Sequence, residues 1–354
     1  MKTFSTLFKE YPSLYTDKNF NAKVDNIINA KKKDESNNKD YWFKTVYMFG
    51  GENPEKFQLN YIKQYKNIDV VLFPFKNLKY KINKASAEIT DINGKTHTFN
   101  KDLSKESLVL IRSIDKDNNE ITKKISDIGY LCLNKPGEGK FDKCETAELL
   151  KKNDVDQPAF CIINKSDTED KETFFKKLKD IYKDITLNNE DNYDFVVKIP
   201  DGSCGIGVFM CNGKEIYSIM QTCFKLKPDQ KFIIQEKEEC EADIRIEVLT
   251  HNDNQEILIC VQRNKISGDF RCNAHLGATL SQIELTREQK ELALKAAKAT
   301  GMIWCGVDLM HCKDGKNLII EINRTPQNTL IYIEKENKLH FEKLFDFINK
   351  EFIK

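Results

Sequence analysis

The stretch "GVDLMHCKDGKNLIIEINRTP" (residues 306–326) alternates apolar and polar residues on both sides of Asp314-Gly315. An Asp-Gly pair between two alternating runs predicts a β-hairpin with a two-residue turn, in which both central residues have positive φ. Such a turn places Asp308 directly opposite Glu321. Two facing carboxylates repel each other across a β-ladder. On a half-buried face they therefore need a cation or a shared proton between them.

A divalent metal ion is the partner that we predict for these carboxylates. Asn323 follows two residues after Glu321 on the same face, beside Met310 and Ile319. The three polar side chains offer hard oxygen ligands and leave room for water and phosphate oxygens, which suits Mg²⁺. The alternative is a solvent-facing hairpin that tolerates the repulsion. We predict a magnesium site formed by Asp308, Glu321 and Asn323.

A glycine-rich segment, "VVKIPDGSCGIGVFM" (196–210), lies between two strand-like runs. Glycines let backbone N–H groups approach phosphate oxygens, and Lys198 adds positive charge on the preceding strand. The segment is neither a Walker A loop nor a dinucleotide fingerprint, because a strand follows it and Gly-Lys-Ser/Thr is absent. Taken alone, the segment also fits a plain turn.

Two further segments carry charged residues at strand ends. "FIIQEKEECEADIRIEV" (232–248) ends a strand at Glu236, where a carboxylate and backbone groups can meet a purine amino group and a ribose. "QRNKISGDFRCNAHLGA" (262–278) contains Arg263 and Arg271, whose planar guanidinium groups suit carboxylate and phosphate oxygens. Each segment taken alone also fits a solvated loop.

Composition places the chain among ordinary globular proteins. Its 354 residues suffice for two or three domains, and a net charge of +1 gives no reason to expect nucleic acid binding. No run of about 18 apolar residues predicts a membrane span, and the N-terminus lacks the apolar core of a signal peptide. The 11 cysteines form no C-x-x-C pair. We therefore expect reduced, structural thiols in a cytoplasmic protein.

The order of predicted elements indicates an α/β protein. Residues 1–40 resemble a helical arm and a polar linker, and 41–132 alternate strands ("WFKTVYMF", "IDVVLFPF", "LVLIRSI") with a helix ("PEKFQLNYIKQYK"), which predicts a parallel sheet. Helices are expected at 140–155 and 171–185. In the C-terminal half, the helix 287–300 follows a capping box.

In combination and in this order, the four motifs resemble the ATP-grasp superfamily, specifically the RimK-type glutamate ligases. The similarity covers residues 108–330; residues 41–107 resemble the family only in texture. The resemblance implies an ATP-grasp fold after the arm at 1–40. Its domains are a Rossmann-like pre-ATP-grasp domain at 41–132, a small central domain with a glycine-rich flap at 133–235, and a C-terminal antiparallel-sheet domain with the metal site at 236–354.

The resemblance also implies roles for individual residues. Residues that match the ATP site are Lys143, Lys198, Gly202, Ser203, Gly205, Gly207, Glu236, Lys237, Asp243, Arg271 and Asn273. Catalytic roles are expected for Arg245, Arg263 and Arg271, and the metal ligands match Asp308, Glu321 and Asn323. Arg112 resembles a substrate-contacting arginine. The family's "HRGG" reads His275-Leu276-Gly277-Ala278 here, which leaves the acceptor open.

The activity that the resemblance implies is ATP-dependent ligation of a carboxylate to an amine through an acyl phosphate. ATP and Mg²⁺, which Mn²⁺ can replace, are the implied cofactors. The implied substrates are an amino acid such as glutamate and the carboxylate of a protein C-terminus or peptide. Neither nucleic acid nor membrane is an expected partner, and relatives suggest a homo-oligomer. The alternatives are a ligase of free small molecules, an ATP-grasp kinase and a non-catalytic ATP-binding module.

Overall fold

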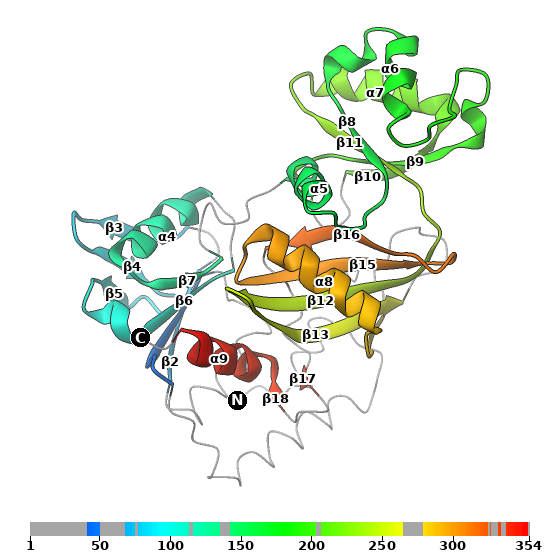
Figure 1. Cartoon of the computed structure of the whole chain (residues 1–354). Coiled ribbons are helices and arrows are strands. Elements are labelled where there is room, and N and C mark those ends of the chain that lie inside the picture. Colours follow the sequence, from blue (N-terminus) through cyan, green and yellow to red (C-terminus); the bar gives the residue numbers. More distant parts are fainter. Residues whose placement is uncertain are drawn as a thin grey trace.

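The structure is a computed structural model that describes residues 41–49, 68–74, 77–112, 116–134, 142–202, 207–264, 279–324, 326, 332–333 and 338–352. The predicted arm at 1–40 and the predicted helix "PEKFQLNYIKQYK" lie outside these residues. Three larger sheets with helices packed on them make up the described part of the chain (Figure 1).

The N-terminal sheet is parallel, as the alternation of strands and helices predicts. Its strand order is β2-β1-β6-β7. The elements are β1 (Thr45–Phe49), β2 (Asp69–Phe73), β6 (Ser107–Ile111), β7 (Leu131–Leu133), helix α4 (Lys116–Ile128), a 3-10 helix (Leu103–Glu106) and a small antiparallel sheet of β3 (Tyr80–Ile82), β4 (Ala87–Thr90) and β5 (Thr96–Phe99). Helix α4 and the small sheet share one core cluster with β1, β2 and β6.

The central sheet is antiparallel, with strand order β10-β9-β11-β8. Its elements are β8 (Phe160–Ile163), β9 (Asp194–Lys198), β10 (Val208–Asn212), β11 (Phe232–Glu236), the helices α5 (Lys143–Lys152), α6 (Lys171–Leu178) and α7 (Gly213–Leu226), and 3-10 helices at Lys165–Thr168 and Glu190–Asn192. The predicted helix 171–185 is wrong in length, since it ends at Leu178. Tyr182 beyond it donates to the carbonyl of Asp194 at 3.0 Å, which holds the chain in a turn against β9.

The C-terminal sheet has strand order β14-β13-β12-β15-β16. Its elements are β12 (Cys240–His251), β13 (Asn254–Asn264), β14 (Thr279–Gln282), β15 (Trp304–Cys312), β16 (Asn317–Asn323) and helix α8 (Arg287–Thr300). The predicted helix 287–300 is confirmed together with its caps. Thr286 accepts from the amide of Gln289 at 3.2 Å, the Gln289 side chain accepts from the amide of Thr286, and Gly301 has φ +68°.

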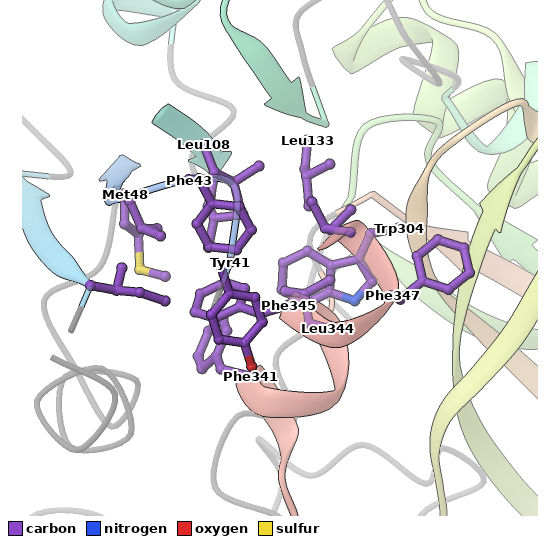
Figure 2. Packing of buried hydrophobic residues seen from close by; sticks show 14 of the residues in the cluster. Tyr41, Phe43, Met48, Leu108, Leu133, Trp304, Phe341, Leu344, Phe345 and Phe347 are labelled. Atoms are coloured by element: carbon purple, nitrogen blue, oxygen red, sulfur yellow. The ribbon is translucent and has the colours of Figure 1, made fainter. Parts of the chain in front are cut away.

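The C-terminal helix α9 (His340–Glu351) joins the N-terminal sheet to the C-terminal sheet; it follows β17 (Tyr332–Ile333) and β18 (Lys338–Leu339). Figure 2 shows Phe341, Phe345 and Trp304 gathered with Tyr41 and Phe43 in one cluster. The rings of Phe43 and Phe345 lie 5.3 Å apart in an edge-on arrangement, a favourable geometry for aromatic pairs. The cluster fixes the N-terminal sheet against β15.

No helix among the described residues has the length and hydrophobicity that a membrane span requires.

Replacing Thr286 by Ala removes the side-chain oxygen that caps α8. We expect the free energy of unfolding to fall by about 1 kcal/mol, measured by urea denaturation. Thr222→Ala is the matched control, because this exposed threonine lies inside α7 and donates only to a carbonyl of its own helix. Equal losses in the two variants would contradict a capping role for Thr286.

Candidate active site at the junction of the central and C-terminal sheets

The hairpin of β15 and β16 places Asp308 opposite Glu321, as predicted, but its turn differs from the prediction. Cys312 donates its amide to the carbonyl of Lys316, so three residues form the loop. Gly315 has φ +89°, whereas Asp314 is not among the described residues with positive φ. The prediction of a two-residue turn is therefore wrong.

A β-bulge restores the predicted pairing. Leu309 faces Ile319, whereas Asp308 faces Glu321, so Ile320 is the extra residue on β16. The bulge turns Ile319 toward α8, where it packs in the same core cluster as Leu309. Our expectation that Ile319 lies on the face of Asp308 is therefore wrong. The bulge leaves the carboxylates of Asp308 and Glu321 on the polar face of the sheet.

Two guanidinium groups from neighbouring strands hold the carboxylate of Asp308. Arg245, its strand partner on β12, donates from Nε to Oδ1 and from Nη2 to Oδ2, the latter at 3.0 Å. Arg263 on β13 lies 3.2 Å from Oδ2 through its Nη2. Arg263 also donates from Nε to Asp243 at 2.8 Å. Two carboxylates and two guanidinium groups thus form one buried network across three strands.

Burial and charge shift the pKa values of the two aspartates in opposite directions. Burial alone raises the pKa of Asp308, but the guanidinium groups of Arg245 and Arg263 outweigh this effect and lower it. Burial is the largest effect on Asp243 and raises its pKa. The negative charge of Asp308 adds to this shift, and the close pair with Arg263 offsets only part of it. Asp308 is therefore the firmly ionised member of the network.

Two lysines from the central part of the chain approach the second carboxylate. Lys143, the first residue of α5, has its Nζ 3.9 Å from Oε1 of Glu321 and donates to the carbonyl of Gly202. Lys198, at the end of β9, is only 8% exposed. Burial lowers the pKa of Lys198 to about 8, although the charge of Glu321 opposes the shift. The lysines, Glu321 and the start of the glycine loop therefore meet at one place.

Two of the residues expected at the ATP site, Glu236 and Lys237, lie at the end of β11 and directly after it. Burial raises the pKa of Glu236, with Glu238 adding to the shift. Lys237 forms ion pairs with Glu239 at 2.8 Å and with Asp194 at 3.8 Å. Glu236 thus lies half-buried at the strand end, while Lys237 is held by acidic neighbours.

Several predicted site residues fall where the structure gives no description. Ser203, Gly205, Arg271 and Asn273 lie outside the described residues, whereas Gly207 is described and has φ +75°. Their roles stay predictions.

Arg112 lies at the end of β6 and reaches the C-terminal sheet. Its guanidinium carbon lies 4.6 Å from the ring centroid of Trp304, and Nη2 donates to the carbonyl of Pro326. Trp304 donates to the fully buried Glu247 at 3.0 Å, and His340 lies 2.8 Å from the same oxygen. Arg112 is therefore fixed beside the segment that follows the hairpin, and its contact with substrate stays a prediction.

Sequence reasoning missed three residues that contribute to the contacts around the segment after β16. Arg324, directly after β16, donates to the carbonyl of Asn134, and the Asn134 side chain donates back to the Arg324 carbonyl at 2.6 Å. A Cβ on Gly306 would lie 3.0 Å from Pro326 and 3.4 Å from Arg245, so a larger residue at this position requires these neighbours to shift. The motif "EINRTP" contains Arg324, but nothing local points to Asn134.

The donor chemistry of Asp308, Glu321 and Asn323 fits a magnesium ion that is shared with a ligand. The Glu321 side chain is 37% exposed, and Asn323 lies 3.4 Å from Oδ2 of Asp308 through its amide nitrogen. Rotating that amide presents an oxygen instead. No group of three or more His, Cys, Asp or Glu in the described part of the chain is arranged to hold a metal. Two carboxylates and an amide suit Mg²⁺ that takes its remaining ligands from phosphate and water.

Comparison with known proteins identifies relatives of this chain. A model of the RimK-like ATP-grasp domain matches residues 140–346. The "probable alpha-L-glutamate ligase" of Vibrio atlanticus is 27% identical over 273 residues, which are 74% of this chain and 83% of that protein. The protein of the same name from Shewanella loihica is 27% identical over 248 residues, 68% of this chain and 75% of its own.

Solved structures show the same fold. D-alanyl-alanine synthetase A from Vibrio cholerae aligns with a TM-score of 0.59 at 14% identity and covers 88% of this chain and 98% of its own. The ATP-grasp ligase PsnB, solved with a minimal precursor, aligns with a TM-score of 0.61 at 15% identity and covers 88% and 99%. The predicted α/β ATP-grasp fold is confirmed.

Replacing Arg263 by Met leaves Asp243 and Asp308 buried with one guanidinium between them. We expect a loss of about 3–5 kcal/mol in the free energy of unfolding, measured by urea denaturation at pH 7. The control is Arg287→Met, because the Arg287 side chain is 91% exposed and its 2.7 Å pair with Glu291 lies in solvent. A loss no larger than in this control would show that the network does not stabilise the sheet.

Proposed function

Because the chain belongs to the RimK-like ATP-grasp family and is a carboxylate–amine ligase, we propose that it adds an amino acid such as glutamate to a peptide or protein carboxylate. One observation links the proposed activity to particular residues. The facing pair Asp308 and Glu321 lies where Lys143 and Lys198 reach across from the central part of the chain. Such a junction of anions and cations suits a metal-bound triphosphate.

The nucleotide lies between the two sheets in this proposal. Lys143 and Lys198 bind phosphate oxygens, together with backbone amides of the glycine loop 201–207. Glu236 and Lys237 contact the adenine and ribose at the end of β11. Asp243 acts near the nucleotide through its contact with Arg263. From outside the described residues, Arg271 and Asn273 complete the proposed ATP site.

The proposed reaction has two steps. An oxygen of the substrate carboxylate attacks the γ-phosphorus of ATP, which forms an acyl phosphate and releases ADP. The amine of the second substrate then attacks the acyl carbon, loses a proton and displaces inorganic phosphate. Neither step needs a covalent bond to the protein, so the protein contributes positioning and charge. Asp308, Glu321 and Asn323 would hold Mg²⁺, which would neutralise charge at the phosphates.

Arg245 and Arg263 are the proposed binding groups for the substrate carboxylate or the tetrahedral intermediate. Their guanidinium groups are already fixed in place by Asp308 and Asp243. Groups that are fixed before the substrate arrives lose little freedom when charge develops. Arg271 adds positive charge at the γ-phosphate in this scheme.

A peptide carboxylate is the acceptor that we favour over a free amino acid. The curated relatives carry the name alpha-L-glutamate ligase, and PsnB, which has the same fold, was solved with a precursor peptide. The alternative is ligation of free small molecules, since D-alanyl-alanine synthetase also shares the fold. Identification of the product distinguishes a peptide acceptor from a free small molecule.

The test is a screen for amine-dependent ADP release with amino acids paired against carboxylate acceptors, including peptides that end in glutamate. We expect a glutamate-extended peptide, identified by mass, and an acyl phosphate that hydroxylamine traps. Glu321→Gln should lower ADP release about 100-fold or more while keeping the melting temperature. Glu288→Gln, on the exposed start of α8, is the control. A phosphorylated product or full activity of Glu321→Gln contradicts the proposal.

Lys198 makes nucleotide binding dependent on pH. Its pKa of about 8 in the nucleotide-free protein means that the ammonium form predominates below pH 8 and is lost above it. Bound phosphates favour the charged form, so the affinity for ATP should fall as pH rises from 8 to 9.5. Calorimetric titration measures this change. The Lys198→Arg variant keeps its positive charge throughout this range, so its affinity for ATP should change little with pH. A parallel decline in both proteins would show that another group causes the pH dependence.

A further inference from the structure

Two cysteines face each other across β12 and β15. Cys240 is the strand partner of Cys312, and both pack in one apolar cluster with Met310. The amide of Lys313 donates to the carbonyl of Glu239 at 2.9 Å, so the hydrogen bond joins the residues that flank the cysteines. This pattern is that of a non-hydrogen-bonded pair, in which opposite Cα atoms of a regular ladder lie about 4.5 Å apart. A bulge separates the pair from Ala242, which faces His311.

That geometry suits a disulfide. Disulfides join residues with Cα atoms roughly 4.4–6.8 Å apart and Cβ atoms on the same side. Cys240 and Cys312 form no disulfide in this structure, and no other two cysteines that the structure describes are strand partners. Sequence spacing gives no hint of this pair, because Cys240 and Cys312 belong to strands that are joined through β13, β14 and α8.

The two thiols differ in access to solvent. Cys240 is half-buried, whereas Cys312 is 1% exposed. Burial raises the pKa of Cys312 to about 11, with Glu238 and Asp314 adding to the shift. An oxidant therefore reaches Cys240 first, and Cys312 stays a protected thiol until its partner has reacted.

We propose that Cys240 and Cys312 form a reversible disulfide site that reacts with low-molecular-weight disulfides. The Cys240 thiolate attacks one sulfur of the oxidant and displaces a thiolate, which gives a mixed disulfide. Cys312 loses its proton to solvent, attacks the Cys240 sulfur and displaces the second thiolate. The protein gives up two electrons and two protons, and the oxidant leaves as two thiols.

The bond would tie the hairpin of β15 and β16 to the connection between the central and C-terminal sheets. Ion pairs already join these segments: Lys313 lies 3.4 Å from Glu239, and Lys316 lies 3.9 Å from Glu238. A covalent link adds a restraint on this connection and on the unfolded chain. Formation of the disulfide requires no bound nucleotide.

The experiment treats the full-length protein with oxidised glutathione and follows it by intact mass and non-reducing peptide mapping. We expect the wild type to lose two hydrogen atoms, to yield a Cys240–Cys312 crosslinked peptide, and to melt several degrees higher until a dithiol reverses the change. Closure should quicken as pH rises toward the pKa of Cys312. The connection 236–240 should exchange its amide hydrogens more slowly when oxidised.

Single variants separate the roles of the two thiols. Cys312→Ala should retain one glutathione on Cys240, and Cys240→Ala should leave Cys312 unmodified. Cys223→Ala, which removes a half-buried cysteine on α7, is the matched control and should crosslink like the wild type. A folded wild type that yields no crosslinked peptide, or that keeps glutathione on Cys240, overturns the proposal.

Discussion

The charge balance around Asp308 is the constraint on which the rest of the site depends. An ionised carboxylate that is 6% exposed is strongly unfavourable unless cations and hydrogen bonds replace the lost water. Arg245 and Arg263 provide this replacement from two neighbouring strands. The two guanidinium groups also lower the pKa of Asp308, so its carboxylate stays ionised at neutral pH.

The second carboxylate depends on a different part of the chain. Glu321 meets Lys143 only because α5 packs against both sheets: Cys144 contacts the central sheet, whereas Leu150 belongs to the core beneath α8. A capping box at Asp142 fixes the first turn of α5, where Lys143 lies. The helix thus couples the position of one cation to the packing of two layers.

The same packing positions the N-terminal sheet. Arg112 reaches over Trp304, and Arg324 exchanges hydrogen bonds with Asn134 at the end of β7. Through α9 the aromatic cluster secures these contacts (Figure 2). In the proposed function, a substrate that enters beside Arg112 therefore meets a surface whose distance from the Asp308 network is fixed by core packing. Such preorganisation reduces the reorganisation that accompanies charge development.

Local patterns in the sequence determined the elements whose physics is local. The capping box of α8, the parallel alternation at the N-terminus and the facing of Asp308 and Glu321 were all predictable. That facing was right although the predicted turn was wrong, because the bulge at Ile320 offsets the longer loop. Partners distant in sequence leave no local signal. Only tertiary structure therefore decided that Arg245 holds Asp308, that Lys143 meets Glu321, and that Cys240 faces Cys312.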